Sequence, residues 1–182
     1  METLADLFRL GRSLDIATLL WVRRGVRRLG ATQVEVAFHL LCRLADAVMW
    51  PVHALFVLVY SGFEWGPCLR LVFATILATL ASQAIKRAVQ RPRPRVTLPN
   101  LRPRFADPDG FSLPSGHAAA TAAAATAAFM AHDPLTGAYV VFALLVGWGR
   151  VILGAHYPLD VLTGAIFGIA AGAVGRALVA AL

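Results

Sequence analysis

Three clusters of polar residues in this sequence have the types and spacing that suit the handling of an anion. The first spans residues 86–94 and reads KRAVQRPRP, the second spans residues 114–117 and reads PSGH, and the third spans residues 150–160 and reads RVILGAHYPLD. A phosphate ester can be cleaved without a metal when cations, a nucleophile and a proton donor come together. The clusters contain side chains for each of these tasks.

The cations are expected to be Lys86, Arg93 and Arg150. The guanidinium group is a planar fork of N–H donors that matches two phosphate oxygens at once. Ser115 and Gly116 stand where an alanine-rich helix is expected to begin. Because the free N–H groups of a helix N-terminus bind anions, these two residues are expected to form a phosphate cradle.

The bond-forming and proton-transfer steps are expected to involve two histidines. Asp160 follows His156 by four residues, and a carboxylate on one imidazole nitrogen fixes the tautomer and leaves the other nitrogen free to attack phosphorus. His117 is then the candidate acid that protonates the leaving group. Water would afterwards hydrolyse the phosphohistidine.

The remaining histidines and arginines are expected to have structural roles. We assign His39, His53 and His132 to ordinary packing, because a lone histidine near an apolar segment is usually a satisfied structural residue. Arginines beside apolar spans usually anchor lipid headgroups, and this interpretation covers Arg87, Arg91, Arg95, Arg102 and Arg104.

The elements that must position these residues are membrane helices. Apolar residues make up 58% of the chain, mean hydropathy is +0.67, and a bilayer-spanning helix needs about 20 apolar residues. The third apolar stretch is mostly alanine and the fourth is short, so a compact all-α bundle is expected, a polytopic transmembrane fold of about five spans plus an N-terminal interfacial helix. The expected spans are about 44–63, 67–85, 115–131, 134–148 and 158–182.

The order of the spans places the three clusters together. Two crossings separate the Arg- and Pro-rich loop 86–114 from residues 149–157, so both lie on the same side of the membrane. In the last span Gly164, Gly168 and Gly172 recur every four residues. This spacing puts them on one helical face and predicts close packing against another helix.

The N-terminal part has a different character. Residues 1–44 mix leucines with arginines, including Arg23, Arg24, Arg27 and Arg28, and are interpreted as an amphipathic interfacial segment with arginines toward lipid headgroups. The alternative for the first 30 residues is an ordinary helix packed on the rest of the protein. Residues 45–182 form the membrane-embedded domain. The net charge of +7 lies between apolar spans, which favours lipid headgroups or a phosphorylated substrate over nucleic acid. No cleaved signal peptide is expected.

The ordered set K-x6-RP, PSGH and R-x5-H-x3-D resembles the type 2 phosphatidic acid phosphatase superfamily, and the resemblance covers about residues 45–182. The resemblance implies a lipid phosphatase that needs no metal or organic cofactor. The composition of the chain resembles that of bacterial members of the family, which implies a location in the bacterial cell membrane. The phosphate ligands would be Lys86, Arg93, Ser115, Gly116 and Arg150, with His156 as nucleophile, Asp160 as its partner and His117 as acid. One position departs from the pattern: Gly149 stands where the third motif usually has serine, so a hydroxyl that could bind phosphate is lost.

Several alternatives stay open at this point. A catalytically weak or inactive membrane scaffold of the same fold would explain the spans but not the intact motifs, and a transporter would place its ionisable residues nearer the bilayer midplane. The sequence does not distinguish a phospholipid monoester from a polyprenyl diphosphate and carries no signal of oligomeric state. The positive-inside rule applied to Arg23, Arg24, Arg27 and Arg28 favours a cytoplasmic site, whereas the resemblance favours the extracytoplasmic face, which we prefer.

Overall fold

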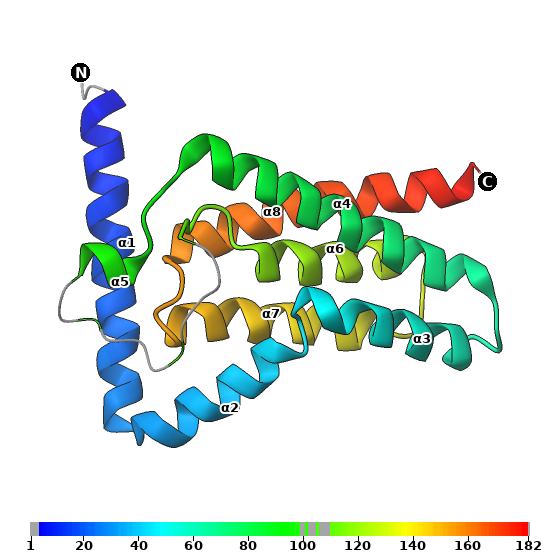
Figure 1. The fold of residues 1–182 in the computed structure, drawn as a ribbon, viewed down its shortest axis with the longest axis horizontal. Coiled ribbons are helices and arrows are strands. Elements are labelled where there is room, and N and C mark those ends of the chain that lie inside the picture. Colours follow the sequence, from blue (N-terminus) through cyan, green and yellow to red (C-terminus); the bar gives the residue numbers. More distant parts are fainter. Residues whose placement is uncertain (1–3, 99–100, 102–104, 106–109, 182) are drawn as a thin grey trace.

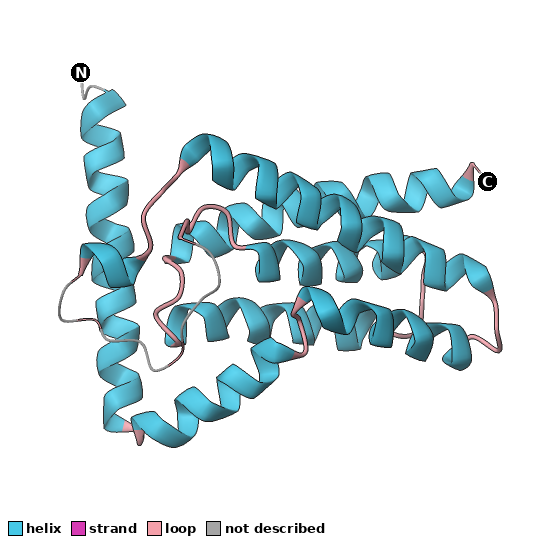
Figure 2. Ribbon diagram, in the orientation of Figure 1, coloured by secondary structure: helices cyan, strands magenta, loops and turns pink. Residues whose placement is uncertain are grey.

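The computed structural model describes residues 4–98, 101, 105 and 110–181, and side chains from residue 11 onward. The predicted all-helical class is confirmed over this part of the chain (Figure 2). Arg102 and Arg104, which were interpreted as headgroup anchors, lie outside the described residues. The described helices are α1 (Leu4–Arg28), α2 (Ala31–Arg43), the 3-10 helix η1 (Ala47–Met49), α3 (Trp50–Tyr60), α4 (Trp65–Val89), α5 (Pro94–Thr97), α6 (Gly116–Met130), α7 (Thr136–Ile152) and α8 (Pro158–Ala180).

The five predicted spans correspond to α3, α4, α6, α7 and α8, which run side by side as a bundle (Figure 1). The alanine-rich helix α6 is the central one, since it packs against α4, α7 and α8. Alanine is only weakly apolar, so a helix of this composition gains little from facing lipid. Its small side chains instead let three neighbours approach closely, and most of its residues from Ala118 to Ala127 are buried.

The three glycines of α8 lie against α6, as the spacing predicted. A Cβ atom added at Gly164 or Gly168 would overlap a backbone carbonyl oxygen of α6, and one added at Gly172 would lie 2.6 Å from the carbonyl oxygen of Ala123. The two backbones therefore touch along the whole interface. Because both partners lack large side chains, this contact fixes the distance between the helices with little freedom.

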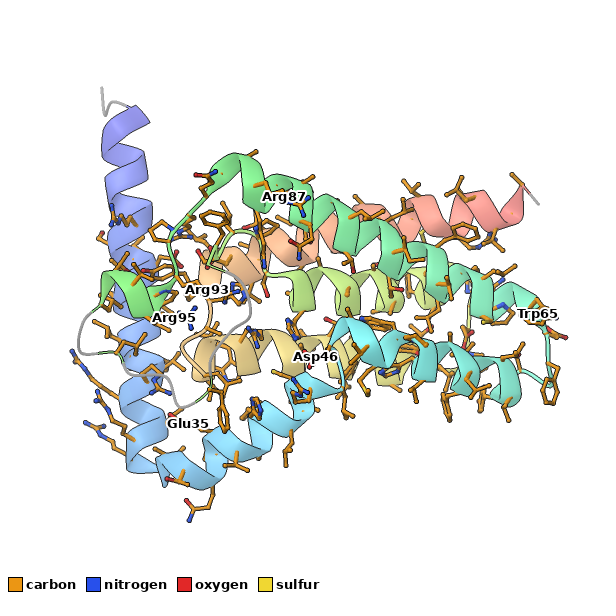
Figure 3. All side chains as sticks on the ribbon, viewed as in Figure 1. Glu35, Asp46, Trp65, Arg87, Arg93 and Arg95 are labelled. Atoms are coloured by element: carbon orange, nitrogen blue, oxygen red, sulfur yellow. The ribbon has the colours of Figure 1, made fainter. Side chains whose placement is uncertain are left out.

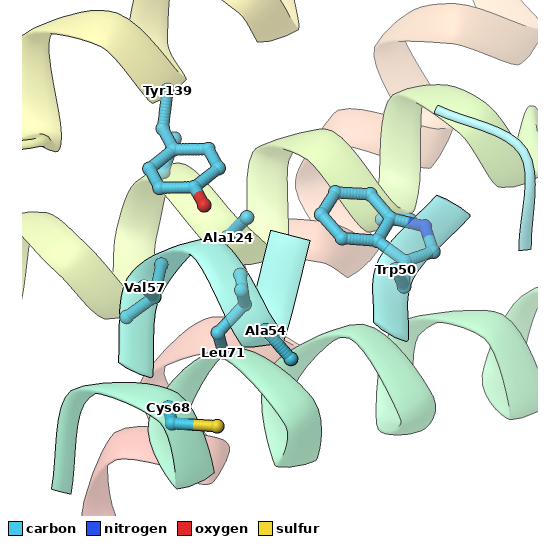
Figure 4. Close-up of a cluster of buried hydrophobic side chains, with 9 residues drawn as sticks. Trp50, Ala54, Val57, Cys68, Leu71, Ala124 and Tyr139 are labelled. Atoms are coloured by element: carbon cyan, nitrogen blue, oxygen red, sulfur yellow. The ribbon is translucent and has the colours of Figure 1, made fainter. Parts of the chain in front are cut away.

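Large apolar side chains cover the outside of the bundle, as expected for a surface that faces lipid. Within the described residues, α4 and α8 are each long and apolar enough to cross a membrane, and α2 with η1 and α3 forms a candidate span bent by 54°. Away from the three clusters, the bundle is filled by a cluster of buried side chains around Trp50, Leu71 and Tyr139 (Figure 4).

Helix α1 crosses one end of the bundle at a steep angle (Figure 1). Its buried stripe of Leu19, Val22 and Val26 packs on residues at the end of α7. Arg23 is paired with Glu35 of α2 and donates a hydrogen bond to the carbonyl oxygen of Ile152 at 2.8 Å. For Arg23 the packed-helix alternative therefore holds and the headgroup alternative does not, because a buried carboxylate twelve residues later binds it.

Candidate active site

A cavity of about 570 Å³ opens at the end of the bundle that α1 crosses. It is bounded by the C-terminal end of α4, the first turn of α6, the end of α7 and the turn between α2 and η1. Arg93 lies at this end and Trp65 at the opposite one (Figure 3). The predicted site residues that line the cavity are Lys86, Arg93, Gly116, His117, Arg150 and His156.

His156 lies in the turn between α7 and α8 and is 1% exposed. Its Nδ1 atom is 3.6 Å from an oxygen of Asp160, and its Nε2 atom is 3.3 Å from a guanidinium nitrogen of Arg93. The carboxylate and the cation thus lie on opposite sides of the ring. Such an arrangement leaves Nε2 facing the place where an anion bound to Arg93 would lie.

Asp160 lies behind His156, outside the cavity wall, and its side chain is fully buried. It occupies the first turn of α8, where one carboxylate oxygen accepts a hydrogen bond from the backbone N–H of Tyr157 at 2.9 Å. This capping contact is local, because it joins residues three apart. The helix start that Pro158 initiates therefore fixes the carboxylate relative to the preceding histidine.

Ser115 and Gly116 form the start of α6, as predicted, but only Gly116 lines the cavity. Ser115 is fully buried, does not line the cavity, and caps the helix by accepting from the N–H of Ala118 at 3.4 Å. Its own N–H donates to the backbone carbonyl of Asp160 at 2.8 Å. Gly116 lines the cavity, and a Cβ atom there would meet nothing within 4 Å. The helix N-terminus is thus open to an anion and tied to the turn that holds His156.

The cations converge from three different elements. Lys86 comes from α4, Arg150 from α7 and Arg93 from the segment before α5, and they are 5%, 7% and 2% exposed. Arg93 is oriented by a hydrogen bond of 2.8 Å to the carbonyl of Ala155, next to His156. Burial of three cations around one cavity favours a ligand that carries more than one negative charge.

Arg91 was interpreted as a headgroup anchor, and that prediction is wrong. Its guanidinium group is 2.7 Å from Asp160 and 2.5 Å from Asp15, and it lies over the ring of Tyr157 at 4.3 Å. Burial acts to lower the pKa of Arg91, but the carboxylates of Asp160 and Asp15 outweigh this and raise it above its ordinary value. Arg91 therefore stays charged beside the partner of His156.

Sequence reasoning missed Asp15 altogether, although the pattern contains a signal. Asp15 lies on the same helical stripe as Leu19, Val22 and Val26, all of which are buried. A carboxylate on an apolar stripe needs a buried partner, and the arginine-rich loop offers several. Asp15 is thus recognisable from the sequence as a paired residue, but the arginine that pairs with it is not.

Asp46 is a second residue that the sequence did not single out. It lies between α2 and η1, lines the cavity, and is 2.8 Å from the Nε2 atom of His117. Arg43 lies 3.0 Å from the other oxygen of the same carboxylate. A carboxylate hydrogen-bonded to an imidazole favours the protonated ring. The turn after α2 thus supplies a group that suits His117 to act as an acid.

Gly149 does not line the cavity. A Cβ atom at this position would lie 2.9 Å from Cys42 Sγ and 2.9 Å from Phe38 Cδ1. The position faces α2, and its missing side chain lets α2 pack closely on α7. The substitution of glycine for the usual serine is therefore explained by helix packing.

The chain resembles known proteins in family, in sequence and in fold. The family model described as PAP2 superfamily matches residues 67–181. The chain is 38% identical over 88 residues to decaprenylphosphoryl-5-phosphoribose phosphatase of Mycolicibacterium smegmatis, covering 48% of this chain and 47% of that protein. It is 33% identical over 102 residues to lipid A 1-phosphatase of Rhizobium johnstonii, covering 54% and 42%. The chain thus matches just under half the length of these relatives.

The fold is similar to a solved structure over nearly its whole length. The crystal structure of a transmembrane PAP2-type phosphatidylglycerolphosphate phosphatase from Bacillus subtilis matches with a TM-score of 0.76 and 20% identity, covering 95% of this chain and 88% of that one. At this identity the likeness concerns the fold. It extends over α1 and α2 as well as the bundle, since so little of the chain is left unmatched.

Proposed function

This chain is an integral membrane protein of the PAP2 superfamily, and from that membership we propose that it hydrolyses a lipid phosphate or lipid diphosphate without a metal. The observation that carries the proposal is the position of His156 between Asp160 and Arg93, at a cavity that Lys86 and Arg150 also line. The substrate is a phospholipid monoester or a polyprenyl diphosphate.

In the first step Nε2 of His156 attacks the phosphorus atom held by the cations and the N-terminus of α6. The N–P bond forms as the bond from phosphorus to the leaving oxygen breaks, and the electron pair goes to that oxygen. His117 donates its proton to the leaving oxygen. Negative charge that develops on the phosphoryl oxygens is stabilised by Lys86, Arg93 and Arg150.

In the second step water hydrolyses the phosphohistidine. The water oxygen attacks phosphorus, the N–P bond breaks with its electron pair returning to Nε2 of His156, and the proton of the water passes to His117. His117 is thereby restored as an acid and phosphate leaves. Asp160 stabilises the positively charged imidazole through both steps.

The active site is proposed to face away from the cytoplasm of a bacterial cell. The arginines near the N-terminus were the argument for the opposite orientation. Arg23 is buried against Glu35 and no longer counts as a topology signal, which weakens that argument. Labelling of a single exposed cysteine placed in α1 with a membrane-impermeant thiol reagent, in intact cells, tests the orientation.

The first test is phosphate release by the purified protein in detergent, with and without chelator. The panel comprises phosphatidate, phosphatidylglycerophosphate, a polyprenyl diphosphate and a phosphorylated sugar lipid, and His156→Ala is the control. Turnover that survives chelator and disappears in the variant is expected. No release from any substrate would favour the alternative of an inactive membrane scaffold, and release that needs added metal would refute the mechanism.

A second test separates the roles of the two histidines. An aryl phosphate has a leaving group that departs without a proton, so in a single turnover His117→Asn is expected to lose much less of its rate of leaving-group release on it than on a lipid phosphate. Steady-state turnover of both substrates is expected to fall, because hydrolysis of the phosphohistidine needs His117 as base. His156→Ala is expected to lose both activities, because no nucleophile remains. Equal losses in the two variants on both substrates would contradict the assignment of His117 as acid.

A further inference from the structure

Asp15 connects α1 to the turn that holds the nucleophile. Its side chain is fully buried. One carboxylate oxygen accepts from the backbone N–H of Leu159 at 2.9 Å, and the other lies 2.5 Å from Arg91. Both partners are adjacent to Asp160, one along the chain and one through an ion pair. The carboxylate of Asp15 therefore contacts the two groups that flank Asp160, the partner of His156.

Arg91 is held by two carboxylates and a ring. One guanidinium nitrogen donates to Asp160 at 2.7 Å, another donates to Asp15 at 2.5 Å, and the plane lies 4.3 Å from the ring centre of Tyr157. A guanidinium group is rigid and planar, so fixing two of its nitrogens fixes its orientation. The position of Asp15 thus determines where Arg91 meets Asp160.

The charges of Asp15, Asp160 and Arg91 do not cancel. In their ionised forms Asp15 and Asp160 bring two negative charges to the single positive charge of Arg91, which lies within ion-pair distance of both. One negative charge therefore remains next to Nδ1 of His156, which lies 3.6 Å from the other oxygen of Asp160. Without Asp15, the positive charge of Arg91 would no longer be shared between two carboxylates and would act on Asp160 more strongly. The ring that becomes positively charged during phosphoryl transfer would then be stabilised less by Asp160.

We propose that Asp15 is a positioning residue for phosphoryl transfer, which through Arg91 holds Asp160 against His156 and keeps its negative charge available to the imidazole ring. The inference rests on the proposed function. Asp15 lies in α1, outside residues 67–181 that the family model matches. Helix α1, whose sequence resembles that of a membrane-surface helix, thus contributes a residue that acts on His156 through Arg91 and Asp160.

A purely structural role would be to fasten α1 to the bundle. Leu19 provides the matched control, because it lies one helical turn further on the same face, is fully buried and packs at the end of α7. Leu19→Ala removes apolar contact and loosens α1 without changing any charge near His156. Asp15→Asn keeps the size of the side chain and removes the charge.

The experiment measures kcat and KM for wild type, Asp15→Asn and Leu19→Ala, each normalised to correctly folded protein. Asp15→Asn is expected to lower kcat by at least about tenfold and to leave KM within about twofold, since the phosphate ligands are untouched. Leu19→Ala is expected to keep kcat near the wild-type value. Equal falls in both variants, or no fall in Asp15→Asn, would overturn the inference.

A double-mutant cycle adds a readout that a structural role would not give. If Asp15 acts through Asp160, then Asp15→Asn is expected to cause no further fall in kcat when Asp160→Asn is already present, measured on an aryl phosphate. Additive falls would refute the proposed route. If Asp15→Asn does not fold, Arg91→Lys replaces it, because lysine keeps the positive charge and loses the planar fork that positions Asp160; an unchanged kcat would then overturn the inference. An inactive wild type would refute the proposed function itself, and this inference with it.

Discussion

The α6–α8 interface and the attachment of α1 support the same site by opposite means. Between α6 and α8 the contact consists of glycine, alanine and backbone, with Gly164 against Ser115 and Gly168 against Ala119. Helix α1 packs on the end of α7 by its apolar stripe and is also held by buried charges, Arg23 to Glu35 of α2 and Asp15 to Arg91 beside the site. The α6–α8 contact sets the distance between the two helices by steric exclusion. The ion pair of Asp15 sets the charge and the orientation of Arg91 beside Asp160.

This difference shows which part of the site is held rigidly by backbone contacts and which part depends on the charges of side chains. A backbone contact has no side chain that can move aside, so the cradle at Ser115 and the turn at Asp160 are held together firmly. An ion pair has directional partners, and removing one of them leaves the other charge buried and uncompensated. Variants in the α6–α8 contact should therefore affect the folding of the bundle, whereas variants of the buried charges should affect the docking of α1 and, at Asp15, activity.

The largest expected effect is on folding, in Gly168→Val. The added atoms would overlap the carbonyl oxygen of Ala119, so the two helices must separate, at a cost of more than about 4 kcal/mol. Loss of the monodisperse protein in size-exclusion chromatography is expected. The matched control is Gly25→Val in α1, where a Cβ atom meets nothing within 4 Å. A Gly168→Val protein as stable as the control would show that α6 and α8 can move apart.

The second prediction concerns the buried pair of α1. Glu35→Gln leaves the charge of Arg23 buried without its carboxylate, which is expected to lower the apparent Tm at a cost of about 3 kcal/mol. The double variant Arg23→Met/Glu35→Leu removes both charges and is expected to recover most of the loss. If the double variant is no better than the single one, the damage comes from lost hydrogen bonds and not from an unpaired charge.

The third prediction tests the junction between the two regions. Gly149→Ser restores the usual serine of the third motif but places a Cβ atom 2.9 Å from both Cys42 and Phe38, so it is expected to destabilise the protein by about 2 kcal/mol. Cys42→Ala in the same chain should return part of the stability. Thermal unfolding followed in detergent measures both. A lower KM for Gly149→Ser at unchanged Tm would instead show that the serine hydroxyl reaches phosphate.

The smallest effect is expected for Asp46→Asn, which weakens the partner of His117. The fall in kcat on a lipid phosphate is expected to be about tenfold, or about 1.4 kcal/mol. In a single turnover of an aryl phosphate, whose leaving group needs no proton, the fall in the rate of leaving-group release should be much smaller. Equal falls on the two substrates would show that Asp46 supports the shape of the cavity and not the acid.

The bundle was predictable because its signals are local. Apolar stretches gave the five bundle helices, glycine spacing gave the α6–α8 contact, and counting two crossings put the C-terminal ends of α4 and α7 at the same end of the bundle. Spacing also gave the pairing of His156 with Asp160, since residues four apart meet on a helix start. What could not be predicted was the choice of partner for Arg91 among residues far apart in the chain.

The sequence alone thus determined the helical class, the set of candidate residues and the side of the bundle on which they meet. Each of these follows from hydrophobic length or from spacing along one element. The tertiary structure decided that Gly149 faces α2, that Asp46 lies against His117, and that Asp15 shares Arg91 with Asp160. These contacts join residues tens of positions or more apart, so they depend on the angle at which α1 and α2 pack on the bundle. No periodicity within a single segment encodes that angle.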